Sequence, residues 1–295
     1  MNHSERVPGT IEDYFQLLKP RITFLVLVTT LAGSILAAGG PLPWIIVLHT
    51  LVGTALASGG ASALNQYMER DVDGLMRRTQ SRPLPQGRLT PRAVLIYGTL
   101  VSIAGVAYLA LTVNLLTAGV AAFTILSYLL IYTPSKRVTW LSTLIGAVPG
   151  AMPPVIGWAA LCNDLGPEAW VLFAIVFLWQ IPHFLAIAWM YRSDYARAGF
   201  PVLPVQDPHG GRTGRHITWN CLALLAVSLV PTLLGLTGKV YFVGALVIGL
   251  AFLAFGIATA VLKTNLSARR LLVASIIYHP ILLALIVFDA TRVVF

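Results

Sequence analysis

Charged side chains are scarce in this sequence. Asp, Glu, Lys and Arg make up 11% of the 295 residues, whereas hydrophobic residues make up 57% and the mean hydropathy is +0.79. A soluble domain carries about 25% charged residues, so this chain has too little polar surface to cover a water-soluble globule of its size. The shortage excludes an ordinary soluble enzyme and indicates a protein that lies in a lipid bilayer.

Cysteines are few, and a recognisable targeting signal is missing. Cys162 and Cys221 have neither metal-binding nor redox spacing, so we interpret them as apolar fillers, with a disulfide as the weaker alternative. Residues 1–19 lack the basic-then-apolar order of a cleaved signal and the Arg-rich, acid-poor character of a mitochondrial transit peptide. We therefore expect a bacterial rather than an organellar protein.

Apolar runs long enough to cross a bilayer, which takes about 20 residues, recur along the whole chain. They predict an all-α, polytopic membrane bundle of about nine transmembrane helices. The expected spans lie near residues 22–39, 44–63, 94–112, 115–132, 141–160, 169–190, 216–236, 240–262 and 271–290. No repeat of fixed period and no separate soluble segment are visible, so residues 1–295 are expected to form a single domain.

The net charge of +9 does not indicate nucleic-acid binding, because the basic residues occupy the loops between the spans. With a cytoplasmic N-terminus, nine spans leave all 20 Lys and Arg residues on the cytoplasmic side except Lys239 and Arg292. This orientation satisfies the positive-inside rule, which the opposite orientation would break. Two long loops, 64–93 and 191–215, then lie on the cytoplasmic side, and loops of that length are usually functional.

A polar motif follows the second span without a break. Asn65, Glu69 and Asp73 are four residues apart, so they share one face if the helix continues. Two carboxylates at this spacing repel each other and are costly at a membrane boundary unless a cation lies between them. Such oxygen ligands suit Mg²⁺, which also takes substrate phosphates into its shell. The alternative is a solvated helix end with ion pairs such as Asp73 with Arg77; Asp71 points elsewhere and has no assigned role.

Motifs along nearly the whole chain resemble the intramembrane aromatic prenyltransferases, the family typified by 4-hydroxybenzoate polyprenyltransferase. The Asn-x-x-x-Glu-x-x-x-Asp pattern, followed by Arg78-Thr79 and Arg82-Pro83-Leu84, is similar to the first motif of that family. Three further segments are similar to its haem-farnesylating branch, the protoheme IX farnesyltransferases or haem O synthases. They are YFQLLKPR at 14–21, WQIPHFLAIAW at 179–189 and YRSDYARAGFPVLPV at 191–205.

The resemblance implies farnesyl diphosphate as the donor, haem b as the acceptor, haem O as the product and Mg²⁺ as the cofactor. The metal ligands that we expect are Asn65, Glu69, Asp73 and Asp194. Together with Lys136 these residues form the expected catalytic set. The expected substrate contacts are Arg70, Arg77, Arg78, Arg82, Tyr132, Arg137 and His183. For Lys136 and Arg137, which follow the fourth span, a cytoplasmic anchor is the alternative role.

The second acidic motif of the family is reduced in this chain. In the loop after the sixth span only Asp194 remains, and Gln66 replaces an acid of the first motif. Relatives carry further acids at the positions that are here Phe184, Tyr191 and Tyr195. The reduced set fits one tightly held Mg²⁺, or a second ion held mostly by diphosphate oxygens. A helix cap, or an ion pair with Arg192 or Arg197, is the alternative for Asp194.

Three histidines, His49, His183 and His279, lie in the interior of predicted spans, whereas His216 stands at the first residue of one. His183 follows Pro182 near the cytoplasmic end of the sixth span, and imidazole is a natural ligand of haem iron or partner of a propionate. A hydrogen bond between helices is the alternative for His183. For His49 and His279, taken singly, such a hydrogen bond is the expected role.

The sequence therefore predicts a multi-pass protein of the bacterial inner membrane whose active site faces the cytoplasm. The resemblance leaves room for a downstream haem A synthase or terminal oxidase as a partner. The nearest alternative is an Mg-dependent polyprenyltransferase acting on 4-hydroxybenzoate or another aromatic acceptor. A membrane transporter is the second alternative, although acids at one face and no visible repeat argue against it. The Gly- and Asp-rich signature of CDP-alcohol phosphotransferases is absent.

Overall fold

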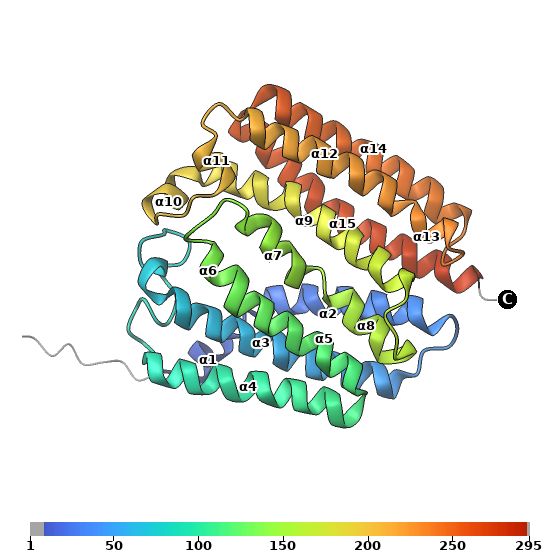
Figure 1. The fold of residues 1–295 in the computed structure, drawn as a ribbon, viewed down its shortest axis with the longest axis horizontal. Helices are drawn as coiled ribbons and strands as arrows, with labels where there is room; N and C mark the ends of the chain where they lie inside the picture. Colours follow the sequence, from blue (N-terminus) through green and yellow to red (C-terminus); the bar gives the residue numbers. More distant parts are fainter. Residues whose placement is uncertain (1–8, 294–295) are drawn as a thin grey trace, which may run out of the picture.

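The computed structural model describes residues 9–293, which form α-helices joined by short connections and contain no strand. Figure 1 shows the long helices running side by side in one bundle. In chain order the elements are α1 (Ile11–Leu17), α2 (Pro20–Ala38), α3 (Trp44–Asp73), α4 (Pro91–Thr112), α5 (Leu115–Leu126), the π-helical turn η1 (Ser127–Tyr132), α6 (Thr133–Ser135), α7 (Ser142–Gly150), α8 (Pro153–Cys162), α9 (Pro167–Met190), α10 (Arg192–Arg197), α11 (Leu203–Gln206), α12 (Gly211–Ser228), α13 (Val230–Leu233), α14 (Lys239–Leu262) and α15 (Asn265–Val293).

Within the described residues, nine helical segments are long and apolar enough to cross a membrane. Six of them are single helices, namely α2, α3, α4, α9, α14 and α15. The other three join consecutive helices over Leu115–Ser135, Ser142–Cys162 and Gly211–Leu233. The predicted nine-span, all-α membrane bundle is confirmed, and each span lies where an apolar run predicted it.

The second span departs most from its predicted bounds. We expected a loop from residue 64, but α3 continues to Asp73 and the connection to α4 begins at Gly74. The helix can continue because the polar side chains of its last turns have partners inside the bundle. Asn65 bonds Thr133, and Gln66 bonds the carbonyl oxygen of Leu17. The continuation that the acidic motif requires is therefore present.

The fifth span is interrupted, which the apolar run over 141–160 did not predict. α7 ends at Gly150 and α8 begins at Pro153. Prolines at 149, 153 and 154 remove backbone donors that an unbroken helix would use. Pro149, Gly150 and Pro153 line the main cavity of the bundle, so the break lies next to the site described below.

Glycines bring α3 and α4 into close contact. A Cβ atom at Gly60 would lie 2.5 Å from the backbone nitrogen of Ser102, and one at Gly105 would lie 2.5 Å from that of Ala57. Small residues of this kind let membrane helices approach until their backbones are in van der Waals contact. The helix that carries the acidic motif is thus packed firmly against its neighbour.

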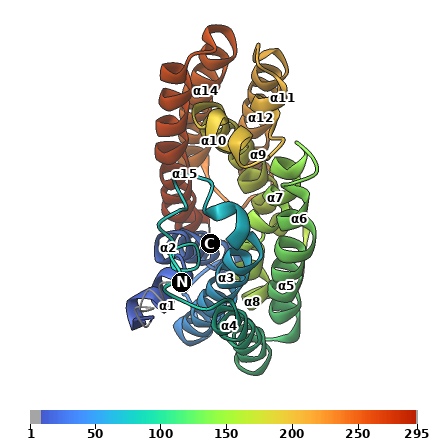
Figure 2. The ribbon, with the colours of Figure 1, turned by 90° about the vertical axis from the view of Figure 1, so that its left-hand side faces the viewer.

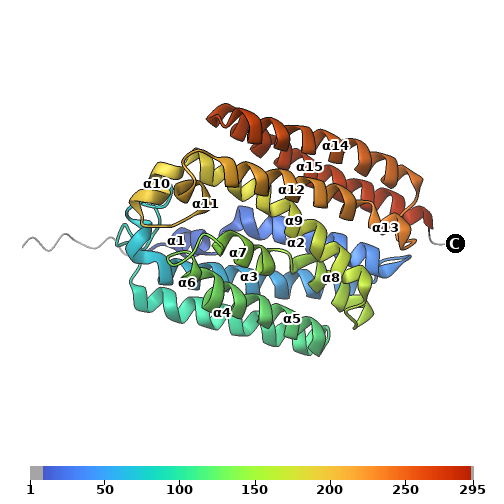
Figure 3. The same ribbon diagram turned by 45° about the horizontal axis from the view of Figure 1, so that its top comes forward.

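The irregular segments gather at one end of the bundle. Figure 1 shows α1, α10, α11 and the connection from α3 to α4 at the left end, and the C-terminus at the opposite end. Figure 2 looks onto the left end and shows α10 and this connection in front of the long helices. In Figure 3, α14 lies along one side of the bundle and α4 with α5 along the other. The two segments predicted to be functional loops therefore share an end.

Candidate active site

A cavity of about 970 Å³ lies inside the bundle. Ligand pockets in proteins range over about 300–1,000 Å³, so this cavity is large. Many of its lining residues are apolar or small, among them Val26, Ala57, Ile125 and Ile156. The polar and charged lining includes Lys19, Asn65, Glu69, Asp73, Arg78, Arg82, Tyr132 and Lys136.

The three motif residues of α3 line this cavity and are each buried. Lys136 Nζ lies 2.7 Å from Glu69 Oε1, and Arg82 Nη1 lies 2.6 Å from Asp73 Oδ2. A buried carboxylate without a partner would be strongly destabilising. The two cations, which come from outside α3, therefore allow α3 to hold its carboxylates inside the protein.

Arg82 reaches Asp73 because the connection after α3 folds back on the end of the helix. Thr79 Oγ1 donates a hydrogen bond to the carbonyl oxygen of Asp73 at 2.7 Å. The ion pair between Asp73 and Arg77, which was the alternative role for this carboxylate, is not formed. Arg77 is exposed, and Arg82, nine residues after Asp73, takes its place.

Lys19 also lines the cavity, although its charge by itself indicated only the cytoplasmic side of the membrane. It lies directly before α2 in a left-handed backbone conformation, with φ of 47°. Its Nζ donates a hydrogen bond to Asn65 Oδ1 at 3.3 Å. Burial lowers the pKa of Lys19 to about 7, and the charges of Arg82 and Lys136 act in the same direction. Its position in the segment YFQLLKPR, immediately before a span, was the available signal.

The turn η1 places a further group of residues at the cavity. Thr133, which follows the turn, accepts a hydrogen bond from Asn65 Nδ2 at 3.1 Å. Lys136 Nζ lies 4.5 Å from the centre of the Tyr132 ring. Burial alone would lower the pKa of Lys136, but Tyr132 and the carboxylate of Glu69 outweigh it and raise that pKa above its ordinary value. π-Helical turns are frequent at functional sites, and no sequence pattern predicted this one.

The side-chain oxygen atoms that α3 offers as ligands are of the kind that Mg²⁺ prefers. Each carboxylate uses one oxygen in its ion pair, and Glu69 Oε2 and Asp73 Oδ1 make no hydrogen bond within residues 9–290, whose side chains the structure describes. The described part of the chain contains no group of three His, Cys, Asp or Glu side chains that could hold a metal ion. Mg²⁺ commonly uses one or two carboxylates and fills its shell with water and substrate phosphates, so a small oxygen set suffices.

Several predicted substrate contacts lie away from the cavity lining. Arg70 is 3.7 Å from Asp71 and stacks over Tyr67. Arg137 is exposed, and its Nη2 lies 3.4 Å from the carbonyl oxygen of Met68. The exposed Arg77 is also outside the lining. The structure thus brings Arg78, Arg82, Tyr132 and His183 to the cavity, but not these three arginines.

Asp194 lies in α10 and does not line the cavity either. Its carboxylate is buried and forms an ion pair with Arg197, three residues later on the same helix. This is one of the two ion pairs that we considered as its alternative role. Tyr195, the next residue, does line the cavity.

The histidines of the spans have three different surroundings. His183 lines the cavity, and its Nδ1 lies 2.7 Å from Ser275 Oγ of α15. His49 bonds Tyr108 at 2.7 Å, as expected for a histidine between helices. His279 lines the cavity and is buried, but its ring makes no hydrogen bond to the described residues, so the expected interhelical bond is absent. The ring of Trp179 stacks on both cavity histidines, 5.1 Å from His183 and 4.3 Å from His279.

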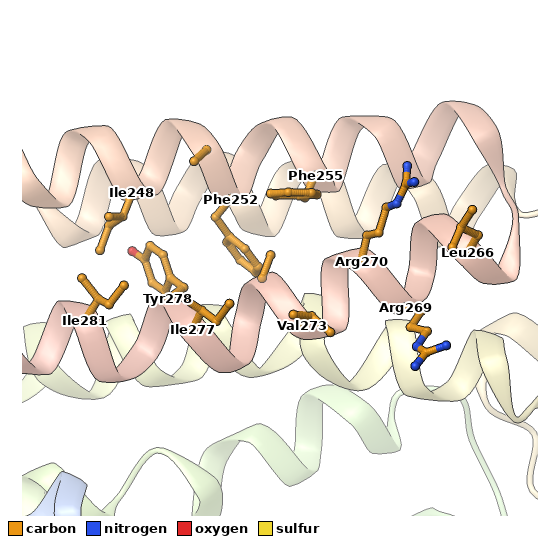
Figure 4. Close-up of a pocket in the computed structure, with 12 residues that line it drawn as sticks. Ile248, Phe252, Phe255, Leu266, Arg269, Arg270, Val273, Ile277, Tyr278 and Ile281 are labelled. Carbon is orange, nitrogen blue, oxygen red and sulfur yellow. The ribbon is translucent and has the colours of Figure 1, made fainter.

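A second cavity, of about 440 Å³, lies between α14 and α15. Figure 4 shows Ile248 and Ile281 near one end and Arg269 with Arg270 near the other. Its lining is almost entirely apolar and includes no carboxylate. It therefore lacks the groups that the chemistry predicted from the sequence requires.

Comparison with known proteins gives consistent results. The UbiA prenyltransferase family matches residues 26–279. A protoheme IX farnesyltransferase of Solibacter usitatus (strain Ellin6076) is 50% identical over 288 residues, which cover 95% of this chain and 99% of the relative. A protein of the same name from Koribacter versatilis (strain Ellin345) is 42% identical over 97% of this chain and 95% of its own.

Solved structures of lower sequence identity share the fold. A digeranylgeranylglyceryl phosphate synthase is 15% identical, with a TM-score of 0.81 over 96% of this chain and 99% of that one. A UbiA homologue from Archaeoglobus fulgidus, bound to DMAPP and Mg²⁺, is also 15% identical, with a TM-score of 0.64 over 93% and 99%. The helical arrangement is therefore that of intramembrane prenyltransferases.

Proposed function

Because the chain belongs to the UbiA prenyltransferase family, we propose that it transfers the farnesyl group of farnesyl diphosphate to a vinyl group of protoheme IX (haem b), giving haem O. Two curated relatives that match most of the chain carry the name of this activity. The structural observation that carries the reaction type is the large cavity, where the buried carboxylates of α3 meet cations beside a mainly apolar interior.

The diphosphate of the donor binds at the end of the cavity that holds Lys19, Arg82 and Lys136. Arg82 offers a planar pair of donors to phosphate oxygens, and the two lysines act as point charges. Arg78 lines the same cavity. A concentration of positive charge beside buried carboxylates suits a ligand that brings both phosphate and a divalent cation.

The side chains that would hold Mg²⁺, the proposed cofactor, are those of Asn65, Glu69 and Asp73. When bound, the ion would supply positive charge that offsets the negative charge of the diphosphate. The Archaeoglobus homologue bound to DMAPP and Mg²⁺ supports a divalent metal in this family. Asp194 receives no ligand role, because its carboxylate is paired within α10 and does not line the cavity.

Catalysis by the protein consists mainly of stabilising charge and excluding water. Lys136 and Arg82 stabilise the negative charge that builds on the diphosphate as the C1–O bond breaks and the leaving group takes the electron pair. The terminal carbon of the haem vinyl group then bonds to C1. The positive charge left on the other vinyl carbon is quenched by a water molecule, which loses a proton and leaves a hydroxyl group.

The walls of the cavity protect the reactive farnesyl carbon. Tyr128, Tyr132 and Trp179 line the cavity, and the faces of aromatic rings attract cations. The apolar side chains that make up much of the remaining lining keep bulk water away until the new carbon–carbon bond has formed.

The protein acts in the inner membrane of a bacterium, with the N-terminus and the carboxylate end of the cavity on the cytoplasmic side. The placement of the basic residues supports this orientation, since all but Lys239 and Arg292 then lie on the cytoplasmic side. The product, haem O, would pass to a haem A synthase or to a terminal oxidase.

A product assay tests the proposal. The purified protein in detergent is given haem b, farnesyl diphosphate and Mg²⁺, and the extracted haem is analysed by mass spectrometry. We expect a mass gain of one farnesyl group plus water, which disappears when EDTA is added. An unchanged haem, together with diphosphate release on 4-hydroxybenzoate, would overturn the proposed acceptor and favour the aromatic polyprenyltransferase.

A further inference from the structure

The wall of the cavity formed by α9 and α15 contains two histidines, which differ in their hydrogen bonds. His183 bonds Ser275 Oγ, whereas His279 makes no hydrogen bond to the described residues. Both rings line the cavity together with Trp179. Ser275 itself is fully buried, so its hydroxyl can serve only the groups around it.

The hydrogen bonds of Ser275 determine where the proton of His183 lies. Ser275 Oγ is 2.6 Å from the carbonyl oxygen of Leu272. A carbonyl oxygen cannot donate, so the single hydroxyl proton lies between these two oxygens. The contact of 2.7 Å between Ser275 Oγ and His183 Nδ1 therefore requires the proton to be on Nδ1. A neutral ring in this tautomer carries its lone pair on Nε2.

Ser275 also holds the neighbour that orients the ring. Trp179 Nε1 donates a hydrogen bond to the carbonyl oxygen of Ser275 at 2.9 Å. The indole stacks on His183 with an angle of 28° between the ring planes. The imidazole is thus restrained at one edge by the hydroxyl and on one face by the indole, while Nε2 makes no hydrogen bond within residues 9–290, whose side chains the structure describes.

We propose that Ser275 is a positioning residue that holds His183 with its proton on Nδ1, so that Nε2 binds the iron of the haem acceptor. Histidines that bind metals commonly donate their other N–H to an oxygen acceptor, which sets the tautomer and the ring orientation. An imidazole nitrogen is a natural axial ligand of haem iron. The inference rests on the proposed function, because haem is the acceptor that it assigns to this cavity.

His183 and His279 also differ in whether a hydrogen bond fixes the orientation of the ring. His279 also stacks on Trp179, but no hydroxyl or carbonyl group of the described chain orients its ring. Its Nδ1 is buried without a partner. The structure therefore assigns the iron to His183, and the porphyrin to the cavity that also contains the carboxylates of α3.

Porphyrin titrations followed by absorbance spectroscopy test the assignment. The purified full chain in detergent is titrated with ferric haem b and, separately, with metal-free protoporphyrin IX, which cannot be ligated through iron. We expect Ser275→Ala to weaken haem binding by about 10-fold to 100-fold, the usual effect of removing such a supporting group, and to shift the Soret band. Binding of the metal-free porphyrin should stay unchanged. Ser275→Thr, which keeps a hydroxyl group, should restore most of the haem affinity.

Ser228 offers a matched control. It is fully buried, and its Oγ donates to the carbonyl oxygen of Leu225, three residues earlier, as Ser275 does to Leu272. Its Oγ makes no hydrogen bond to a histidine of the described residues, so Ser228→Ala should leave both titrations unchanged. His183→Ala should weaken haem binding at least as much as Ser275→Ala.

Two outcomes would overturn the proposal. Equal weakening of haem and of metal-free porphyrin in Ser275→Ala would show that the serine packs the wall and orients no ligand. Unchanged haem affinity in both Ser275→Ala and His183→Ala would place the iron elsewhere. Neither outcome bears on the proposed function, which fails only if the wild-type protein forms no haem O from haem b and farnesyl diphosphate.

Discussion

The carboxylates of α3 and the carboxylate of α10 lie at the same end of the bundle but have different kinds of partner. Glu69 and Asp73 pair with cations from outside their own helix and line the cavity. Asp194 pairs with Arg197 on its own short helix and does not line the cavity. Burial alone therefore does not distinguish a residue of the candidate site, since all three carboxylates are buried. What separates them is whether the paired cation comes from another segment of the chain that also lines the cavity, as Arg82 and Lys136 do and Arg197 does not.

The largest effect should come from removing the divalent metal, because all the proposed metal ligands lie on α3. EDTA should reduce haem O formation to background, and an excess of Mg²⁺ should restore it. The measurement is the mass spectrometric product assay at fixed substrate concentrations. Activity that is insensitive to EDTA would contradict the metal site.

Substitution of Asp73 should have the next largest effect. Asp73→Asn removes the charge that pairs with Arg82 and that belongs to the proposed metal site, and we expect kcat to fall by about 100-fold to 1,000-fold, as for the loss of one electrostatic group at a reacting centre. Asp71→Asn is the matched control, because Asp71 is exposed, two residues away, and outside the cavity lining. Similar losses in both variants would break the distinction between the two carboxylates.

Lys136 should matter more than its neighbour in sequence. Lys136→Met removes the partner of Glu69 and a positive charge at the proposed diphosphate site, so we expect about a 100-fold loss of kcat/KM for farnesyl diphosphate. Arg137→Met should cost far less, because that exposed side chain only reaches the carbonyl oxygen of Met68. Steady-state kinetics of the two variants would decide, and a larger loss in Arg137→Met would reverse the assignment.

The smallest effect is expected for the carboxylate of α10. Asp194→Asn breaks an ion pair with Arg197, whose side chain is 48% exposed, and a pair with a solvent-exposed partner contributes little. Activity should stay within about threefold of wild type, which corresponds to about 0.6 kcal/mol. A loss as large as that of Asp73→Asn would show that Asp194 joins the metal site during turnover. The distinction between the carboxylates of α3 and that of α10 would then be wrong.

The fold was largely predictable from the sequence. Runs of apolar residues predicted all nine spans, because a bilayer requires a minimum length of apolar helix. The exceptions were local. The break between α7 and α8 lies inside an apolar run, and the continuation of α3 to Asp73 lies inside a polar one. Hydropathy reports whether a segment can lie in lipid, but prolines and internal hydrogen bonds decide where its helix ends.

The candidate site was predictable in part. The spacing of Asn65, Glu69 and Asp73 placed them on one face of a helix, and α3 has the helical continuity that this required. Lys19 and Ser275 received no role from the sequence. Lys19 lies in the segment YFQLLKPR, but nothing in that segment shows which side chain Lys19 meets, and Ser275 lies in no motif. Both acquire a role only through contacts with residues far along the chain.

By itself, the sequence determined that this protein lies in a membrane, how many helices cross it and which side chains share the polar face of α3. These properties depend on hydrophobicity and on the helical repeat, which are local. Only the tertiary structure decided which side chains pair with one another in the cavity. Lys136 meets Glu69 across 67 residues of chain and His183 meets Ser275 across 92. Such pairs depend on how the helices pack against one another, and the periodicity of a single helix carries no information about its neighbours.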